Sequence, residues 1–225
     1  MSDGAEHIET FGWQDCAERL DALLSERTML ASRTGKHFVS AEEIDGNPAV
    51  EFFAPQCFPL TSETQVPQEF LEQLSEDLGE HLIVLIQAGA AALGWWRDEE
   101  AVHSKVIKAY VVRGRGRSQT LHVKTKGKSR YGSRLRLQNA QKQLVDISEK
   151  IHEWWSEGGA PDRIFYSCPQ RSWPELFAAR PPPPFDQRDE RLVKIPMHVH
   201  VPNLEELQRV RRKLLRGRVV VRGEG

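Results

Sequence analysis

Basic side chains with no carboxylate among them dominate the middle of the sequence. Residues 101–145 contain 12 Lys and Arg and no Asp or Glu, and four glycines fall within 113–133. Clustered cations of this kind bind polyanions, because each neutralised phosphate releases condensed counterions. A merely solvated loop is the alternative, but natural surfaces usually intersperse both signs of charge. The candidates for phosphate contact are Lys105, Lys108, Arg113, Arg115, Arg117, Lys124, Lys126, Lys128, Arg130, Arg134 and Arg136.

The composition of this block limits the chemistry it can perform. A two-metal nuclease binds its cations through clustered Asp or Glu, and the block contains neither. The run Gly-Arg-Gly-Arg-Ser-Gln at 114–119 also lacks the Gly-Lys-Ser/Thr ending of a phosphate-binding P-loop. Chemistry in this block must therefore come from Gly, Arg, Ser, Gln, His and the backbone.

Two other groups of side chains are candidates for binding. His198 and His200 have strand spacing and would point to one face, but no Cys or carboxylate at ligand spacing accompanies them. We therefore expect a turn or an edge strand there, with no metal site and no cofactor. Paired tryptophans can stack on nucleobases, but pairs at a strand and at a helix end more often belong to a core. The sequence contains two such pairs, Trp95-Trp96 and Trp154-Trp155.

The formal net charge of −1 conceals a strong segregation of charge along the 225 residues. Residues 1–100 carry 5 basic and 20 acidic side chains, so the neutral total does not exclude a nucleic-acid partner. Three widely separated cysteines without a CxxC pair argue against a disulfide framework. No apolar run is long enough for a membrane span, and the acidic N-terminus does not resemble a signal peptide. We expect a cytoplasmic protein without a membrane partner.

The hydrophobic pattern predicts the elements that position the basic block. Apolar residues at helical spacing predict helices over 13–30, 68–78, 134–155, 173–179 and 204–215, the last with Asn203 as its N-cap. Short apolar or alternating runs predict strands at 50–53, 81–87, 90–97, 101–112, 164–167, 192–195 and 219–221. Residues 1–12 are predicted to be a flexible leader, and residues 113–133 a long mobile basic loop. Strands alternating with helices indicate an α/β or α+β fold, with a mixed β-sheet flanked by helices.

A short run within the basic block resembles a known catalytic segment. Residues Tyr110-Val-Val-Arg113-Gly-Arg-Gly116-Arg-Ser-Gln119 resemble that of the ankyrin-repeat and zinc-finger peptidyl-tRNA hydrolase family. This family is a branch of the superfamily that contains the middle domain of the eukaryotic and archaeal peptide release factor. Three further motifs fit in order: Gly132–Arg136 with Asn139, Asp189–Leu192 with Ile195-Pro196, and Pro202–Val210.

The resemblance has two departures from the pattern of true termination factors. Arg117 and Ser118 separate Gly116 from Gln119, whereas a release factor has a second glycine before its glutamine. This spacing matches the hydrolase branch. The sequence also shows no zinc finger and no ankyrin repeats, so the chain resembles a compact stand-alone member, as in a prokaryote.

The resemblance implies a fold, a site and partners. It implies a release-factor middle-domain-like, RNase H-like catalytic domain over 65–225, preceded by an acidic extension over 1–64 that contains one amphipathic helix. Gln119 and Gly116 would be catalytic, with His122, Tyr110 and Ser118 as assisting residues. We expect a monomer, and the resemblance implies the large ribosomal subunit, through its rRNA, and peptidyl-tRNA as its partners.

Three functions fit these residues. The first is a rescue or quality-control factor that releases nascent peptide from peptidyl-tRNA on stalled large ribosomal subunits. The second is an endonuclease that cleaves the tRNA near its 3′ end, through attack by a 2′-hydroxyl group. The third is a non-catalytic ribosome-binding or RNA-binding module that uses the basic loop only for docking. Composition and spacing do not choose among the three.

Overall fold

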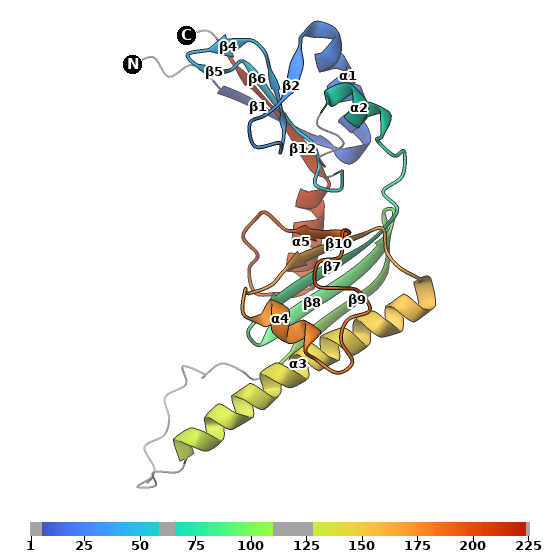
Figure 1. Ribbon diagram of the computed structural model, residues 1–225, viewed down its shortest axis with the longest axis vertical. Coiled ribbons are helices and arrows are strands. Elements are labelled where there is room, and N and C mark those ends of the chain that lie inside the picture. The colour runs from blue at the N-terminus through green and yellow to red at the C-terminus, as the bar shows by residue number, and fades with distance from the viewer. Residues whose placement is uncertain (1–5, 59–65, 110–127, 224–225) are drawn as a thin grey trace. The chain divides into compact units, whose positions relative to one another are not determined.

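The computed structural model describes residues 6–58, 66–109 and 128–223, with side chains from residue 134 onward in the last range (Figure 1). The chain forms two compact units. One unit comprises Met1–Asp77 together with Arg211–Gly225, and the other comprises Leu78–Val210. The predicted boundary between residues 64 and 65 differs from this division, since it places residues 211–225 with the second part of the chain.

The Leu78–Val210 unit is built on a mixed five-stranded sheet. Strands β7 (Glu80–Gln87), β8 (Ala90–Arg97) and β9 (Glu100–Lys108) form an antiparallel meander. Strands β10 (Arg163–Ser167) and β11 (Leu192–Lys194) extend the sheet on the other side of β7 in parallel orientation. The strand order is β11-β10-β7-β8-β9, so β9 is an edge strand. The predicted fold class, α+β with a mixed sheet flanked by helices, is confirmed.

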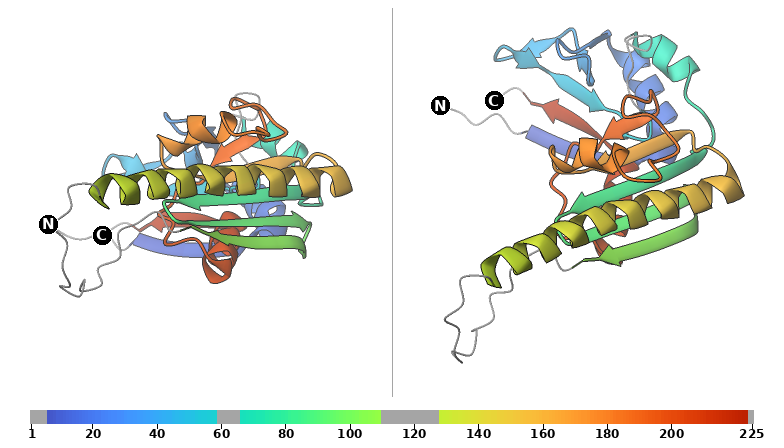
Figure 2. Two further views of the ribbon diagram at one scale, coloured as in Figure 1. Left: turned by 90° about the horizontal axis from the view of Figure 1, so that it is seen from below. Right: turned by 60° about the horizontal axis from the view of Figure 1, so that its bottom comes forward.

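Helices cover both faces of this sheet (Figure 2). On one face, α3 (Lys128–Gly158) packs Leu144, Ile147, Ile151 and Trp154 into a core that α4 (Ser172–Phe177) joins through Leu176. On the other face lies α5 (Leu204–Leu214), and a Cβ atom placed on Gly94 would clash first with the Trp96 ring and would also lie 2.9 Å from Leu207 Cδ2. Glycine at this position thus leaves room for the Trp96 ring and for the close approach of α5 to β8. Strand β7 is buried on both faces as predicted, because helices cover it from either side.

The other unit is an antiparallel sheet with the order β1-β12-β6-β3-β2. Helices α1 (Cys16–Glu26) and α2 (Pro67–Glu72) accompany it, and rings such as Phe11 and Phe52, 5.4 Å apart, form its core. Its strands are β1 (Glu6–Gly12), β2 (Met29–Ala31), β3 (Phe38–Ser40), β6 (Val50–Phe53) and β12 (Arg216–Arg222). A 3-10 helix, η1 (Trp13–Asp15), and a small hairpin of β4 (Glu43–Ile44) and β5 (Asn47–Pro48) complete it.

Two predictions about these elements are wrong. The leader expected at 1–12 is a strand from Glu6 onward, because β1 pairs along its whole length with β12 at the other end of the chain. The basic loop expected up to 133 gives way to helix α3 already at Lys128, and the mobility predicted for 113–127 lies outside the described residues. Among the helices of the described residues, none is both long enough and apolar enough to cross a membrane.

Candidate nucleic-acid interface

The structure places four of the predicted phosphate-binding residues. Lys105 and Lys108 are exposed on the second half of β9, and Arg134 is exposed and Arg136 half-buried on α3. Lys128 and Arg130 belong to α3, but their side chains lie outside the description. The other predicted site residues lie outside the described residues altogether: Tyr110, Arg113, Arg115, Gly116, Arg117, Ser118, Gln119, His122, Lys124 and Lys126.

The end of β9 and the first half of α3 border a common cavity. Lys108 and Ala109 contribute to it from the strand side, and Asn139, Lys142, Gln143 and Asp146 from the helix, around a volume of about 210 Å³. Lys142 is exposed and belongs to the acid-free block, although the phosphate-binding candidates above do not include it. The four exposed cations Lys105, Lys108, Arg134 and Lys142 are called the basic surface below.

A buried amide fixes α3 beside the sheet at this cavity. Gln143 is 4 % exposed; its Nε2 donates to the Gln87 carbonyl at 3.3 Å, and its Oε1 accepts from the Gly89 N–H at 3.3 Å. The Gly89 carbonyl in turn accepts from the Ala109 N–H at 2.9 Å. Both flanks of residues 110–127 are thus held against the β7–β8 turn. These hydrogen bonds set the distance between the end of β9 at Ala109 and α3 at Gln143.

The first described turns of α3 extend beyond the sheet. No side chain from Arg134 to Lys142 is buried, and Leu137 is 61 % exposed. The 31-residue helix is about 46 Å long, whereas a nine-residue strand such as β9 spans about 30 Å. The helix is therefore too long for the sheet to cover (Figure 1). Leu135 and Leu137, which are apolar residues of the helix predicted over 134–155, are exposed for this reason.

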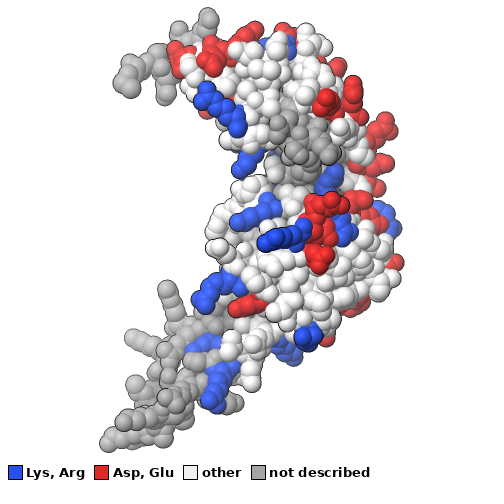
Figure 3. Space-filling view, in the orientation of Figure 1, with Lys and Arg blue, Asp and Glu red and all other residues white. Residues whose placement is uncertain are grey.

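Charge along both flanking elements is polarised toward residues 110–127. Arg134, Arg136 and Lys142 are the charged residues of α3 between 134 and 145, whereas Asp146, Glu149, Glu153 and Glu157 dominate its far half. Strand β9 begins at the acidic Glu100 and has both of its lysines, Lys105 and Lys108, in its second half. Figure 3 shows Lys and Arg side chains toward the N-terminal end of α3. Positive charge and the positive end of the helix dipole thus favour an anionic ligand at this end.

The four cations of the basic surface form no ion pair within the described residues, and the carboxylates that share a cavity with them are Asp146, which lines the cavity with Lys108 and Lys142, and Glu149 and Glu153, which line a second cavity with Lys105. No described residue forms an ion pair or a side-chain hydrogen bond with Lys105, Lys108, Arg134 or Lys142. Arg191 of the same unit, by contrast, is paired: it donates from Nε and Nη2 to Asp189 at 2.8 and 2.7 Å. The Arg191 guanidinium also lowers the pKa of the Asp189 carboxyl, mainly by hydrogen bonding. Unpaired and exposed cations are available for an external polyanion.

The C-terminal motifs of the resemblance have structural roles. The Asn203 Oδ1 accepts from the Glu206 N–H at 2.8 Å, which confirms the predicted N-cap of α5. Glu206, 6 % exposed, accepts from Arg209 Nε at 2.6 Å and from the His200 N–H at 2.7 Å. The Arg209 hydrogen bonds hold the pKa of Glu206 at about 2. These contacts order the segment that leads into α5.

The remaining candidate residues are the paired tryptophans and the two histidines at 198 and 200. Trp95, Trp96 and Trp154 are buried at 1, 4 and 4 % exposure, and Trp155 packs against the same core, as predicted. The rings of His198 and His200 are 5.0 Å apart, in a segment without strand pairing. Within the part of the chain that the structure describes, no group of three or more His, Cys, Asp or Glu side chains is arranged to hold a metal ion.

Comparison with solved structures defines the class of this fold. The structure entitled "Vms1 mitochondrial localization core" aligns with a TM-score of 0.51 at 12 % identity, over 82 % of this chain and 76 % of that chain. At this identity the likeness concerns the fold alone. The archaeal translation termination factor aRF1 aligns with a TM-score of 0.35 at 14 % identity, over 79 % and 46 % of the two chains. That second similarity is too weak to support a conclusion.

The family follows from the sequence match. The model of the Bacteroidetes VLRF1 release factor family matches residues 81–222, which is more than half of the chain. The chain therefore belongs to this family, and the release-factor-like part of the resemblance is confirmed. Its narrower part, the ankyrin-repeat and zinc-finger hydrolase branch, is not tested by these matches and stays a prediction. No curated protein matches the chain.

Proposed function

We propose that this chain is a ribosome-associated rescue factor that releases nascent peptide from peptidyl-tRNA on stalled large ribosomal subunits. The observation that carries the proposal is the release factor family match over residues 81–222, which includes the basic block with Gly116 and Gln119. The Gly-x-x-Gln spacing, with Arg117 and Ser118 between, supports the peptidyl-tRNA hydrolase branch of the resemblance.

In this proposal Gln119 acts by position. A neutral carboxamide is a poor acid or base, so its contribution is to orient a water molecule or the terminal ribose hydroxyl at the scissile ester. Gly116 allows the backbone to approach the substrate closely. The Gln119 N–H is the proposed donor to the developing oxyanion, a contact whose loss typically costs about 100- to 1,000-fold in rate. Tyr110, Ser118 and His122 are the proposed assisting residues.

The cations around the block are proposed to position the substrate. Lys105 and Lys108 on β9 and Arg134 on α3 are exposed and unpaired within the described residues, which suits contact with phosphates of rRNA or of the tRNA acceptor arm. The same role is proposed for Arg136 and for the cations at 113–130. Such contacts fix orientation and register but carry no sequence information.

The test is single-turnover release from purified large subunits that carry peptidyl-tRNA. Wild-type protein is compared with Gln119→Leu, and with Gln68→Leu as a matched control at an exposed glutamine on α2. Both the peptide and the tRNA ends are resolved on a gel. We expect Gln119→Leu to lose at least about 100-fold in release rate while Gln68→Leu matches wild type. Equal release by all three proteins would refute the catalytic assignment.

The same gel separates the two other functions that the sequence left open. Peptide freed together with a shortened tRNA would identify a tRNA endonuclease in place of an ester hydrolase. Salt-sensitive binding to subunits that survives Gln119→Leu, with no peptide released by wild type, would identify a docking module without catalysis.

A further inference from the structure

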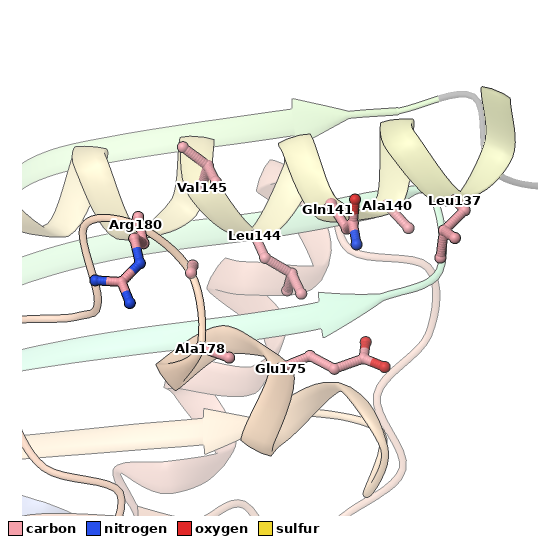
Figure 4. A pocket seen from close by; sticks show the side chains of 9 residues that line it. Leu137, Ala140, Gln141, Leu144, Val145, Glu175, Ala178 and Arg180 are labelled. Atoms are coloured by element: carbon pink, nitrogen blue, oxygen red, sulfur yellow. The ribbon is translucent and has the colours of Figure 1, made fainter. Parts of the chain in front are cut away.

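An apolar pocket of about 310 Å³ lies between α3 and the segment that follows α4 (Figure 4). Leu137, Ala140 and Leu144 line it from the helix, and Ala178 and Ala179 from the opposite wall. Leu144 is 7 % exposed and belongs to the core, whereas Leu137 is 61 % exposed. The pocket therefore begins at the core and opens along the part of α3 that extends beyond the sheet.

Three polar side chains surround these apolar walls. Gln141 comes from α3, Glu175 from α4 and Arg180 from the segment after it. All three are exposed, and no described residue forms a hydrogen bond or an ion pair with any of their side chains. A ligand can therefore bind to them without breaking a contact of the fold. Apolar walls with a few convergent polar groups are typical of small-ligand sites.

Cations stand at both ends of the pocket. Figure 4 shows Arg180 and Leu137 at opposite ends, with Leu144 between them. Arg134 precedes Leu137 by three positions on α3, so its side chain lies on the same stripe of the helix, one turn farther out. An apolar slot with a cation at each end is complementary to a nucleotide in a strand, which has a planar base between two phosphates.

We propose that this pocket binds one unstacked nucleotide of an RNA strand. The base inserts between Leu137 and Leu144, the Glu175 carboxylate accepts a hydrogen bond from the exocyclic amino group of the base, and Arg180 pairs with an adjacent phosphate. A carboxylate accepts from the amino group of cytosine, and uracil has a carbonyl oxygen at that position. Bases held between apolar side chains and read at their edges are a known mode of RNA and flipped-base recognition.

The inference rests on the proposed function, because it assumes an RNA ligand, and it adds a second contact away from Gln119. The pocket and the Lys108–Lys142 part of the basic surface lie on different sides of α3, since residues 137, 140, 141 and 144 line the pocket and residues 139, 142 and 143 line the cavity beside Lys108. Arg134 lies on the pocket side of the helix. An RNA strand that contacts both sides of α3 would fix the axis of this helix relative to the substrate.

The test is an NMR titration of the full chain, labelled at leucine and alanine methyl groups, with CMP and with UMP. The two nucleotides differ in the base edge that Glu175 reads and are alike in charge. We expect both to shift the Leu137 and Leu144 methyl signals, with CMP binding at least about tenfold more tightly. Glu175→Ala should equalise the two affinities.

Ala178→Phe should fill the pocket and abolish binding. Ala160→Phe is the control, at an exposed alanine that does not line the pocket, and it should bind like wild type.

Three results would overturn the proposal. CMP and UMP could bind wild type equally, Ala178→Phe could bind as wild type does, or an acidic amphipathic peptide with leucine anchors could shift these methyl signals when neither nucleotide does. The last result would make the pocket a protein-docking site. The titration contains no ribosome, so its failure leaves the release assay with Gln119→Leu intact, and failure of that assay leaves nucleotide binding measurable.

Discussion

Alanine at Ile147 tests how α3 is held to the sheet. Ile147 is completely buried, and it belongs to the stripe that continues through Ile151 into the core of strands β7 and β8. Truncation of a buried isoleucine to alanine costs about 2–5 kcal/mol, as lost burial plus the cavity left behind. Helix α3 is also fixed by the Gln143 hydrogen bonds one turn earlier, so it cannot move inward to fill the cavity. We therefore expect a loss in the upper half of that range, about 3–4 kcal/mol.

Leu137→Ala is the matched control on the same helix. Leu137 is 61 % exposed and lies beyond the sheet, so its truncation should change the free energy of unfolding by less than about 0.5 kcal/mol. Urea unfolding followed by tryptophan fluorescence measures both variants, because five of the six tryptophans belong to the Leu78–Val210 unit. Equal losses for the two variants, or a loss below about 1 kcal/mol for Ile147→Ala, would refute the reasoning on where α3 is held.

Three further predictions follow from the described contacts. Asn203→Ala removes the N-cap acceptor of α5 and should lower the free energy of unfolding by about 1 kcal/mol in urea titrations. The Arg209 guanidinium holds the pKa of Glu206 at about 2, below its ordinary 4.5, so the carboxylate stabilises the fold above pH 4.5 and loses this effect as the pH falls toward 2. Glu206→Gln should therefore be less stable than wild type at pH 7, and the difference should close between pH 4.5 and 2 in unfolding measured across that range. Replacing both Lys105 and Lys108 by Ala should reduce the slope of log K against log salt for rRNA binding by about 1.4–1.8.

A specific result would contradict each of these three predictions. Unchanged stability in Asn203→Ala would mean that solvent replaces the cap. A difference between wild type and Glu206→Gln that stays constant down to pH 2 would contradict the lowered pKa. For the salt slope, Lys194→Ala is the control, because Lys194 is exposed on β11 at the opposite edge of the same sheet. If Lys194→Ala lowers the slope as much per residue as the β9 lysines do, binding is not localised at the basic surface.

Local patterns in the sequence were sufficient to predict most helices and strands of the Leu78–Val210 unit. The apolar run of β7 predicts burial on both faces, and the short polar turn after β8 predicts the hairpin with β9, because each signal is complete within a few residues. The strand predicted at Val50–Phe53 is also confirmed. The apolar spacing within 134–155 is typical of a helix with Leu144, Ile147 and Ile151 in the core, but it does not show where the sheet ends, so the exposure of Leu137 was not predictable from it.

Pairing between distant segments was the part that the sequence could not reveal. Strand β1 contains acidic residues and an exposed Ile8, so its local pattern does not favour a strand. It forms a strand because Glu6–Gly12 pairs with Arg216–Arg222, more than two hundred positions away. The energy of such pairing depends on cross-strand neighbours that no local window contains. The strands β2 and β3 were missed for the same reason.

Part of the candidate site was also predictable from local sequence, and part depended on contacts between distant segments. Charge alone predicts the basic surface, since a block without carboxylates is visible in the sequence, and Lys142 could have been included on that ground. The pocket beside Leu137 was not predictable, because it requires Ala178 and Arg180, from another segment, to lie against α3. The catalytic assignment of Gln119 rests on motif and family, since that residue lies outside the described part of the chain.

The most direct test of the proposed function is an electron cryo-microscopy map of Gln119→Leu bound to large subunits that carry intact peptidyl-tRNA. The proposal predicts that residues 116–119 lie beside the ester that joins the peptide to the tRNA, with Arg134 and Lys108 against RNA phosphates. A map in which the protein is bound with residues 116–119 away from the acceptor end of the tRNA would contradict it.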